Sequence, residues 1–518
     1  MRLNGWMASL AMTLLAAAAP ALAAAGPVVH VAQGDVAGVR AGGVDSFKAI
    51  PYAAPPVGDL RWRPPAPAAS WSGARDASAF GPGCLQAPHP GVTFSEDCLT
   101  LNVWTPANHP PGAKLPVMVW IFGGAFIEGA SAYPVYDGTH FAERGVVLVS
   151  FNYRIGRAGF FAHPALDRGA TGPVGDYGLM DQIAALKWVQ ANIAAFGGDP
   201  ADVTIFGESA GGISVNYLMA SPAARGLFVK AISESGFGRS RGMPLSGAPD
   251  GKDAEHVGLR FAEANGIHGD DAAAAAALRA LPAEALNAPY GAIGGADTPG
   301  AIIDGRIAVE PFPDVFAKGG QARVPYLVGG NSFEASLFPA VMRYPGVVIS
   351  RLGAGRGRAE ALYGGDTPQA AADLTTDLQI TEPVRFLARA QAAAGEPVFV
   401  YHFSYVPAGE RGQILGAAHG AEVAYVFDNL PTHPVSYGGR EIPAATADDQ
   451  TLSEAMIAYW VAFAKTGDPD SAGGALWPRY TAAGDQLLEF GEDGVNVRQG
   501  FEKDRLDFLE RVAASQGR

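Results

Sequence analysis

The stretch Phe206-Gly207-Glu208-Ser209-Ala210-Gly211-Gly212 organises the chain, because it places a serine between two glycines where a predicted strand meets a predicted helix. The apolar run Val203–Phe206 predicts the strand, and Ile213–Ala220 predicts the helix. In a G-x-S-x-G turn the backbone reverses so sharply that side chains two residues before and two after the serine would collide, and glycine removes that collision. The first N–H groups of the helix then point at whatever the serine attacks, and they stabilise an anion formed there.

The segments on either side of this turn predict an α/β fold. Leu115–Phe122 and Val146–Phe151 are continuous apolar runs of strand length, typical of a parallel sheet covered by helices on both faces. Tyr177–Ala195 repeats apolar residues at helical spacing and is followed by two glycines. The strand that leads to Ser209 comes next, and further strands are predicted at Val324–Val328 and Pro397–Phe403. This order predicts a central, mostly parallel sheet flanked by helices.

A second glycine-containing turn supports a chemical role for the serine. Taken alone, G-x-S-x-G is also typical of a glycine-rich turn without chemistry, and so is a Gly-Gly turn after a strand. Here Gly123-Gly124-Ala125-Phe126 follows the strand that ends at Phe122, in the order expected of an α/β-hydrolase. We therefore expect the backbone N–H groups of Gly124, Ala125 and Ala210 to form a three-donor oxyanion hole.

The composition indicates a globular protein without a nucleic-acid partner. The chain has 518 residues, of which 48% are hydrophobic, enough to bury a large core in one domain with insertions or in two domains. Its formal net charge is −14 and it contains no run of Lys or Arg, so the positive surface that binds a phosphate backbone is absent from the sequence.

The N-terminus has the order of a secretory signal peptide. Arg2 precedes an apolar run from Trp6 to Ala19, and small residues follow as far as Ala25. The alternative is an uncleaved anchor, but the run is shorter than the roughly 20 residues that span a bilayer. No cysteine follows the run that would carry a lipid anchor. We expect residues 1–25 to be removed and a single domain, residues 26–518, to be secreted or periplasmic without a membrane anchor.

The two cysteines of the chain fit an exported protein. Cys84 and Cys98 enclose loop sequence rich in Gly, Pro and His, which predicts a disulfide in an oxidising compartment. Two separate buried thiols are the alternative. Two cysteines at this spacing lack the companion ligands of a zinc site, so no structural metal is expected.

The motifs together resemble those of the type-B carboxylesterase/lipase family, the cholinesterase-like branch of the α/β-hydrolases. The resemblance implies the α/β-hydrolase fold with large insertions, and hydrolysis of small-molecule carboxylic esters through an acyl-enzyme intermediate, with no cofactor or metal and no partner protein. It also implies a catalytic triad in the chain order Ser, then Glu or Asp, then His. The matching segments span nearly the whole chain: Ala54–Gly58, Leu60–Arg63, Ser95–Asn102, Gly123–Phe126, Asn152–Arg154, Gly178–Gln182, Phe196–Pro200 and Phe206–Gly212.

His419 is the expected base of the triad, since Gly416–Glu422 resembles the family's catalytic-histidine loop. A neutral imidazole there accepts the Ser209 proton and later returns it to the leaving alcohol. Among the other histidines after the serine, His402 lies inside a predicted strand and is expected in the core, and His433 lies in a proline-flanked loop.

Glu334 is the expected acid, because Val328–Phe338 resembles the family's acid loop. One departure is Ala335, where the family usually has glycine. Asp304 is the rival acid, but Asp304-Gly305 is typical of a turn.

The resemblance implies supporting roles for further polar residues. Glu208 is too close to the serine in sequence to orient His419 from behind, so we expect it in a buried polar network near the site. Ser235 is expected to support the triad as a neighbouring hydroxyl. Two structural ion pairs are also implied, Arg61 with Glu96 and Arg154 with Asp181.

The substrate is less well defined than the chemistry. Five aromatic residues are candidates for an apolar pocket or for ordinary packing: Phe126, Tyr133, Tyr136, Phe237 and Phe338. Residues 85–97 contain no tryptophan, whereas cholinesterases hold a quaternary ammonium on a tryptophan in the corresponding loop, so a choline esterase is not expected. The alternative to an enzyme is a catalytically silent binding or adhesion protein on the same fold, which the presence of Ser209, Glu334 and His419 argues against.

Overall fold

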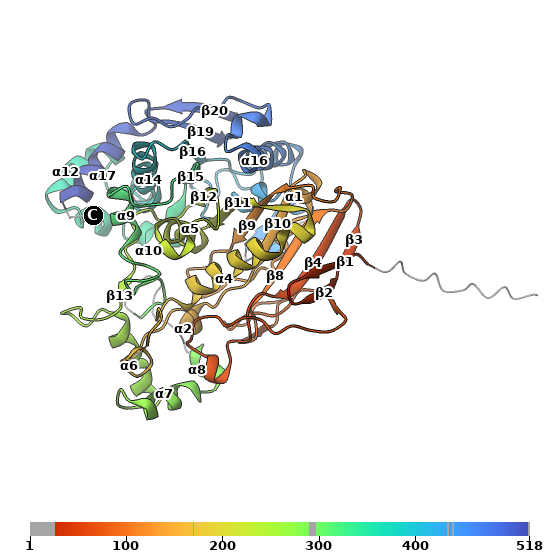
Figure 1. Ribbon diagram of the computed structural model, residues 1–518. Coiled ribbons are helices and arrows are strands. Elements are labelled where there is room, and N and C mark those ends of the chain that lie inside the picture. Colours follow the sequence, from red (N-terminus) through yellow and green to blue (C-terminus); the bar gives the residue numbers. More distant parts are fainter. Residues whose placement is uncertain are drawn as a thin grey trace, which may run out of the picture.

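A large mixed sheet forms the centre of the molecule (Figure 1). The structure is a computed structural model that describes residues 26–168, 170–287, 289, 297–432, 435–437 and 440–515. Within these residues the sheet has 11 strands in the order β20-β19-β16-β15-β12-β11-β9-β10-β8-β4-β3. The strands are β3 (Val39–Ala41), β4 (Val44–Pro51), β8 (Thr100–Pro106), β9 (Leu115–Ile121), β10 (Val147–Phe151), β11 (Gly198–Glu208), β12 (Lys230–Glu234), β15 (Tyr326–Asn331), β16 (Val398–Phe403), β19 (Gln486–Gly491) and β20 (Gly494–Gln499).

The middle of this sheet is parallel and its margins are antiparallel. Every adjacent pair from β19 to β10 is parallel, whereas β20, β8, β4 and β3 join antiparallel to their neighbours. All residues of β10 are buried, as are the last five of β9, which explains their continuous apolar sequences. The predicted central, mostly parallel sheet is therefore confirmed.

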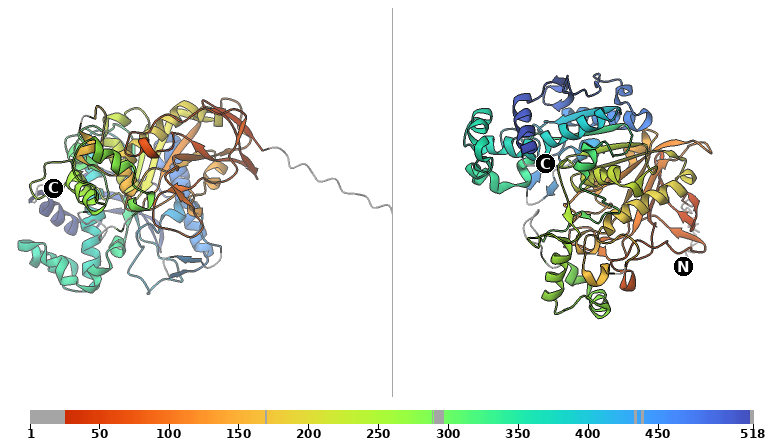
Figure 2. Two further views of the ribbon diagram at one scale, coloured as in Figure 1. Left: turned by 90° about the horizontal axis from the view of Figure 1, so that it is seen from below. Right: turned by 60° about the vertical axis from the view of Figure 1, so that its left-hand side comes forward.

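Helices cover both faces of the sheet (Figure 2). Along one face, α5 (Ala210–Ala220) contacts α4 (Tyr177–Asn192) and α9 (Phe312–Ala317), and α9 contacts α14 (Glu382–Ala393). On the other face, α16 (Ala447–Thr466) packs against β9 and β11. The side chain of Thr446 accepts a hydrogen bond from Asp449 N–H, and the Asp449 carboxylate accepts one from Thr446 N–H, so a capping box starts α16.

Two further groups of helices lie in insertions between the strands, apart from the C-terminal helix, which follows the last strand. One group is α6 (Ala254–Ala264), α7 (Ala272–Arg279) and α8 (Ala283–Leu286), which lies at the bottom of Figure 1. A second group has its own hydrophobic cluster around Ile349, Tyr363 and Phe508. Its helices are α10 (Pro339–Arg343), α11 (Pro345–Ser350), α12 (Arg356–Tyr363), α13 (Pro368–Thr376) and α17 (Lys503–Ser515).

Short elements complete the described chain. The short helices are α1 (Thr139–Glu143), α2 (Gly156–Gly159), α3 (Pro164–Asp167) and α15 (Val423–Val426). The strands outside the main sheet are β1 (Val28–Val31), β2 (Gly34–Ala37), β5 (Ala74–Asp76), β6 (Gly83–Cys84), β7 (Phe94–Ser95), β13 (Met243–Pro244), β14 (Ile302–Ile303), β17 (Val435–Tyr437) and β18 (Arg440–Ile442).

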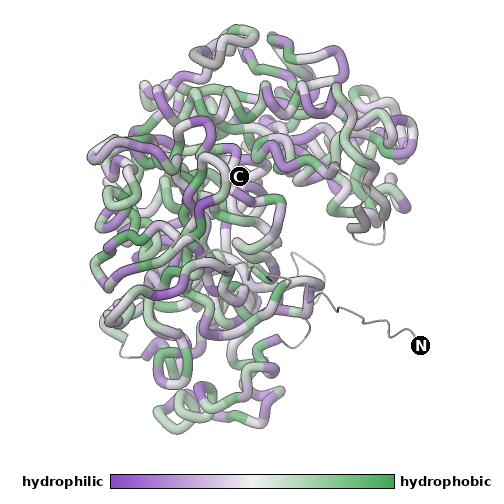
Figure 3. The backbone as a smooth tube through the Cα atoms, turned by 90° about the vertical axis from the view of Figure 1, so that its right-hand side faces the viewer, coloured by the Kyte–Doolittle hydropathy of each residue, from purple (hydrophilic) through white to green (hydrophobic). Residues whose placement is uncertain are grey.

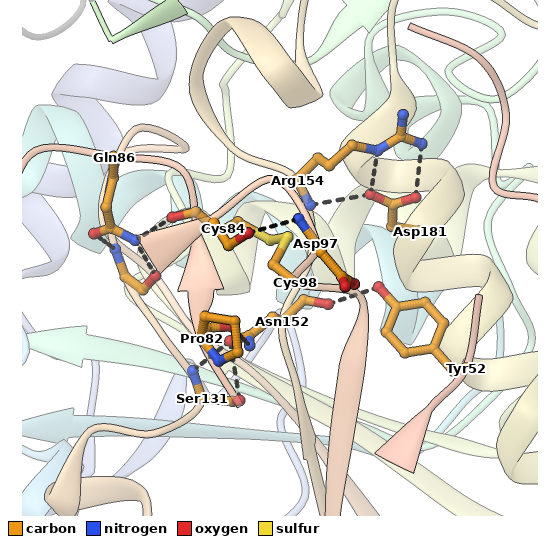
Figure 4. Close-up of a disulfide and its surroundings, with 12 residues drawn as sticks. Tyr52, Pro82, Cys84, Gln86, Asp97, Cys98, Ser131, Asn152, Arg154 and Asp181 are labelled. Carbon is orange, nitrogen blue, oxygen red and sulfur yellow. Dashed lines mark hydrogen bonds and ion pairs between the residues drawn. A yellow bond between two sulfur atoms is a disulfide. The ribbon is translucent and has the colours of Figure 1, made fainter. Parts of the chain in front are cut away.

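The predicted disulfide and both predicted ion pairs are present. Figure 4 shows the disulfide and the Arg154–Asp181 pair. Cys84 and Cys98 are bonded, with their Cα atoms 5.0 Å apart, and both are buried. Arg154 binds Asp181 through two side-chain contacts of 2.8 Å, and its backbone N–H donates to the same carboxylate at 3.0 Å. The carboxylate of Asp181 is thus satisfied although it is fully buried.

The Arg61–Glu96 pair links the disulfide loop to an insertion. Arg61 Nε and Nη2 bind the two carboxylate oxygens of Glu96 at 2.7 and 2.6 Å. Arg61 Nη1 donates to the carbonyl oxygens of Arg279 and Leu281, which lie at the end of α7 and just beyond it.

No helix among the described residues is long and apolar enough to cross a membrane. Figure 3 shows hydrophobic and hydrophilic residues interleaved along the tube. The predicted signal peptide, residues 1–25, lies outside the described residues.

Candidate active site

Ser209 lies at a sharp reversal between β11 and α5. Its backbone has φ 56° and ψ −121°, a conformation that residues with a side chain rarely adopt. Two hydrogen bonds hold it there: Ser209 N–H donates to Glu234 O on the adjacent strand, and Ile213 N–H donates to Ser209 O. The helix begins at Ala210, three residues earlier than the sequence predicts, because the reversal at Ser209 puts the chain directly into helical geometry.

The glycines on either side of the serine are required by close contacts. A Cβ at Gly207 would lie 2.6 Å from Ile121 O and 2.7 Å from the carbonyl carbon of Gly211. A Cβ at Gly211 would lie only 1.9 Å from Ile121 O. The predicted collision therefore exists, and it involves β9 as well as the two ends of the turn.

The turn after β9 lies beside the serine. A Cβ at Gly123 would lie 2.9 Å from the Cβ of Ser209. Gly124, Ala125 and Phe126 all have positive φ, at 98°, 53° and 62°. In the part of the chain that the structure describes, the N–H groups of Gly124 and Ala125 donate to no protein acceptor, and Ala210, as the first residue of α5, has no intrahelical acceptor.

His419 and Glu334 are in direct contact. His419 Nδ1 lies 2.5 Å from Glu334 Oε2. The other oxygen of Glu334, Oε1, accepts hydrogen bonds from Ser235 Oγ at 2.5 Å and from Asn331 N–H at 2.7 Å. Glu334 is 1% exposed, so its charge is stabilised by these three donors and not by water. The Ser235 hydroxyl, which the sequence analysis expects beside the triad, thus contacts Glu334.

Glu208 contacts the opposite side of the same imidazole. His419 Nε2 lies 3.0 Å from Glu208 Oε1, a contact between charges in which the two atoms are not aligned for a hydrogen bond. No hydrogen bond joins His419 Nε2 to Ser209 Oγ within the described residues. Burial opposes a charge on His419, but the carboxylates of Glu208 and Glu334 outweigh it and raise the pKa of the imidazole well above its ordinary value of 6.5.

Two further buried carboxyl groups lie beyond Glu208, and the sequence analysis missed both as members of the site. Glu234 is the register partner of Glu208 on β12, and its Oε1 accepts a hydrogen bond from Trp460 Nε1 at 2.8 Å. Burial, with Glu208 nearby, raises the pKa of Glu234 to about 8. Burial also raises the pKa of Glu422 well above 4.5, and its Oε2 accepts from Asn331 Nδ2 at 2.5 Å. The polar network expected around Glu208 therefore includes groups that favour their neutral forms.

The rival candidates have other roles. Asp304 Oδ1 accepts hydrogen bonds from the N–H groups of Arg306, Ile307 and Ala308, so it closes its own turn. His402 is buried in β16 against Phe501, and burial lowers its pKa to about 4. His433 lies outside the described residues.

The five aromatic candidates divide into packing residues and neighbours of the site. Tyr136 packs on Trp120, Tyr133 packs on Tyr136, and Phe126 packs edge-on against Phe160. Phe237 is a direct neighbour of the imidazole, with its ring 5.9 Å from that of His419. Phe338 is partly buried just after the Glu334 turn, where its N–H donates to Ala335 O.

Metal ligands are not grouped at this site. Among the described residues, no three His, Cys, Asp or Glu side chains lie close enough together to hold a metal ion.

Comparisons with known proteins identify the family. The model of the carboxylesterase family matches residues 25–348 and 360–509. The chain is 40% identical over 488 residues to fumonisin B1 esterase of Sphingopyxis macrogoltabida, covering 90% of this chain and 86% of that protein. It is 34% identical over 479 residues to para-nitrobenzyl esterase of Bacillus subtilis (strain 168), covering 88% of this chain and 92% of that protein.

A solved structure supports the same conclusion. A structure of PNB esterase aligns with a TM-score of 0.78 and 33% sequence identity, covering 93% of this chain and 99% of the other. The predicted α/β-hydrolase fold is confirmed by this likeness. The chain therefore belongs to the carboxylesterase family, a family of carboxylic ester hydrolases.

Proposed function

We propose that this protein is an exported serine hydrolase that cleaves small-molecule carboxylic esters, with Ser209 as nucleophile, His419 as general base and acid, and Glu334 as the acid that orients the histidine. The observation that carries the proposal is the 2.5 Å contact between His419 Nδ1 and Glu334 Oε2. Among the described residues, His419 is the partner of Glu334 in its one salt bridge, and the carboxylate is buried.

The reaction begins when neutral His419 takes the Ser209 proton on Nε2 as the serine oxygen attacks the ester carbonyl. The imidazolium that forms is stabilised by Glu334, which accepts the Nδ1–H. His419 then gives the proton to the leaving alcohol, and an acyl-enzyme remains on Ser209. Water, activated by the same histidine, attacks the acyl group and releases the carboxylic acid.

The tetrahedral intermediates carry a negatively charged oxygen. We propose that this oxygen accepts hydrogen bonds from the N–H groups of Gly124, Ala125 and Ala210. Two of these come from the turn beside Ser209 and the third from the first residue of α5. Donors fixed in place before the reaction stabilise the developing charge without reorganisation, and this is usually the largest contribution of such a site.

His419 Nε2 must leave Glu208 to reach Ser209 Oγ. In the structure it lies 3.0 Å from Glu208 Oε1. Catalytic hydrogen bonds are often poorly aligned without substrate and tighten in the Michaelis complex. We therefore assign Glu208 a positioning role: its charge raises the pKa of His419 and holds the ring beside the serine.

Export is supported by the N-terminal pattern of residues 1–25 and by the disulfide. The substrate class rests on the relatives, whose names specify a fumonisin B1 esterase and a para-nitrobenzyl esterase. Small-molecule esters, including these two classes, are therefore the first substrates to assay.

The direct test of the proposed function is Ser209→Ala. We expect turnover of a para-nitrophenyl ester to fall by at least about 10³-fold, as for other triad serines, with an unchanged melting temperature. Mass spectrometry of the wild-type protein after treatment with an organophosphate should find the label on Ser209. An unlabelled serine, or a variant with near-normal turnover, would contradict the assignment and favour the catalytically silent binding protein.

The acid is tested by comparing two carboxyl residues. Glu334→Gln removes the charge next to His419 Nδ1, so kcat should fall by about 10⁴-fold, the scale known for a triad acid, while KM changes little. Asp304→Asn should lower the melting temperature more than kcat, because Asp304 closes a turn. If kcat is lost in a folded Asp304→Asn protein and kept in Glu334→Gln, the acid is misassigned.

The pH profile tests the role of Glu208. Only neutral His419 is a base, and its pKa is raised. The value of kcat/KM should therefore increase with pH, and the midpoint of this increase should lie above pH 6.5. Glu208→Gln removes one of the two charges that raise this pKa, so the midpoint should move to lower pH. Glu422→Gln is the matched control, since burial already favours its neutral form. A midpoint that is the same in wild type and Glu208→Gln would refute the role of Glu208.

A further inference from the structure

Gln86 joins the disulfide loop, residues 85–97, to the turn beside Ser209. Figure 4 shows Gln86 close to the disulfide. Its side-chain amide bonds both backbone groups of Gly129: Nε2 donates to Gly129 O at 2.7 Å, and Gly129 N–H donates to Oε1 at 2.9 Å. Nε2 also donates to Cys84 O at 3.0 Å. Gln86 is 5% exposed, so this double contact is made out of reach of water.

Gly129 packs directly on the turn at residues 123–126, which carries the N–H groups of Gly124 and Ala125 and which we call the oxyanion turn. A Cβ at Gly129 would lie 2.5 Å from the ring of Phe122 and 2.8 Å from Gly123 O. A Cβ at Gly124 would lie 2.2 Å from Glu128 O. The peptide units on either side of Gly129 therefore lie directly against Gly123 and Gly124.

The oxyanion turn needs such support because its backbone is strained. Ala125 and Phe126 have positive φ although both carry a Cβ, and Gly129 has φ 120°. Conformations of this kind persist only where the surroundings hold them in place. Locally the turn is closed by Ile127 N–H and Glu128 N–H, which both donate to Gly124 O. Gly156 N–H fixes Phe126 O from outside the turn, and Gln86 fixes Gly129.

The disulfide loop holds Gln86 from its own side. Cys84 is bonded to Cys98 and lies two residues before Gln86. The main-chain oxygen of Gln86 accepts a hydrogen bond from Asn287 Nδ2 at 2.9 Å. Both the side chain and the backbone of Gln86 are thus fixed.

We propose that Gln86 is a positioning residue that keeps the oxyanion turn in its reactive shape by clamping Gly129. The proposal rests on the proposed function, because it assigns the N–H groups of Gly124 and Ala125 to the oxyanion. Its effect is on transition-state stabilisation and not on substrate binding. Loss of the clamp should therefore lower kcat with little change in KM.

The test is Gln86→Met, which keeps an unbranched side chain of similar length and removes the amide. We expect kcat to fall by about 10- to 100-fold, less than or equal to the loss of one oxyanion donor, with KM within about twofold of wild type. Affinity for a trifluoromethyl ketone, which forms a tetrahedral adduct with the serine, should fall by the same factor as kcat.

The matched control is Gln391→Met on α14. Gln391 is fully buried, and its Nε2 also donates to two carbonyl oxygens, those of Ala322 and Val324. Its loss should lower the melting temperature while kcat and the ketone affinity stay at wild-type values. Gln86→Glu is the second variant, since a carboxylate still accepts from Gly129 N–H but no longer donates to Gly129 O. If Gln86→Met does not fold, Gln86→Glu takes its place in the test and should show the same loss of kcat.

The outcomes separate this inference from the proposed function. If either folded Gln86 variant keeps wild-type kcat and ketone affinity, Gln86 only satisfies a buried backbone group and the inference is wrong. If the Gln391 control loses kcat to the same extent, the effect is general destabilisation and the inference is again wrong. Failure of wild-type Ser209 to react with an organophosphate would instead overturn the proposed function.

Discussion

The left-handed backbone at Ser209 is the constraint on which the rest of the site depends. A residue with a side chain at φ 56° needs support from its neighbours, and here Glu234 O on β12 holds its N–H. The helix that follows can approach β9 only because Gly207 and Gly211 lack a Cβ. The register of β11 and β12 places Glu208 beside Glu234, at the C-terminal ends of these two neighbouring strands. The turn at residues 123–126, the histidine and the buried carboxyl groups all meet around this one reversal.

Electrostatics at the site are organised around a single imidazole. His419 lies between Glu334 and Glu208, and the pKa of the ring is raised despite its burial. A third and a fourth negative charge at this place would be costly, and burial raises the pKa values of Glu234 and Glu422 so that their neutral forms are favoured. The imidazole therefore contacts Glu208 and Glu334, while the two carboxyl groups beyond them favour their neutral forms.

Features that depend on local sequence could be predicted, and contacts between distant side chains could not. The strand β9, the turn at Ser209 and the disulfide follow from short patterns, namely an apolar run, two glycines and two cysteines. The contact of His419 with Glu208 joins residues more than 200 positions apart and depends on how the ring is oriented, which no spacing reveals. The sequence predicts the start of α5 three residues too late, because glycines suggest a break, whereas here they allow the helix to pack against the sheet. Gln86 gives no signal in the sequence, since its role depends on where the disulfide loop meets Gly129.

We propose that Ser209, His419 and the two backbone segments that carry Gly124, Ala125 and Ala210 act on one reacting carbon. A crystal structure of the enzyme with a trifluoromethyl ketone bound tests it most directly. We expect a bond to Ser209 Oγ and a hemiketal oxygen within about 3.1 Å of the N atoms of Gly124, Ala125 and Ala210. We also expect that His419 Nε2 has moved from Glu208 to the serine oxygen. A hemiketal oxygen that points away from these N–H groups, or an adduct on another residue, would contradict the account.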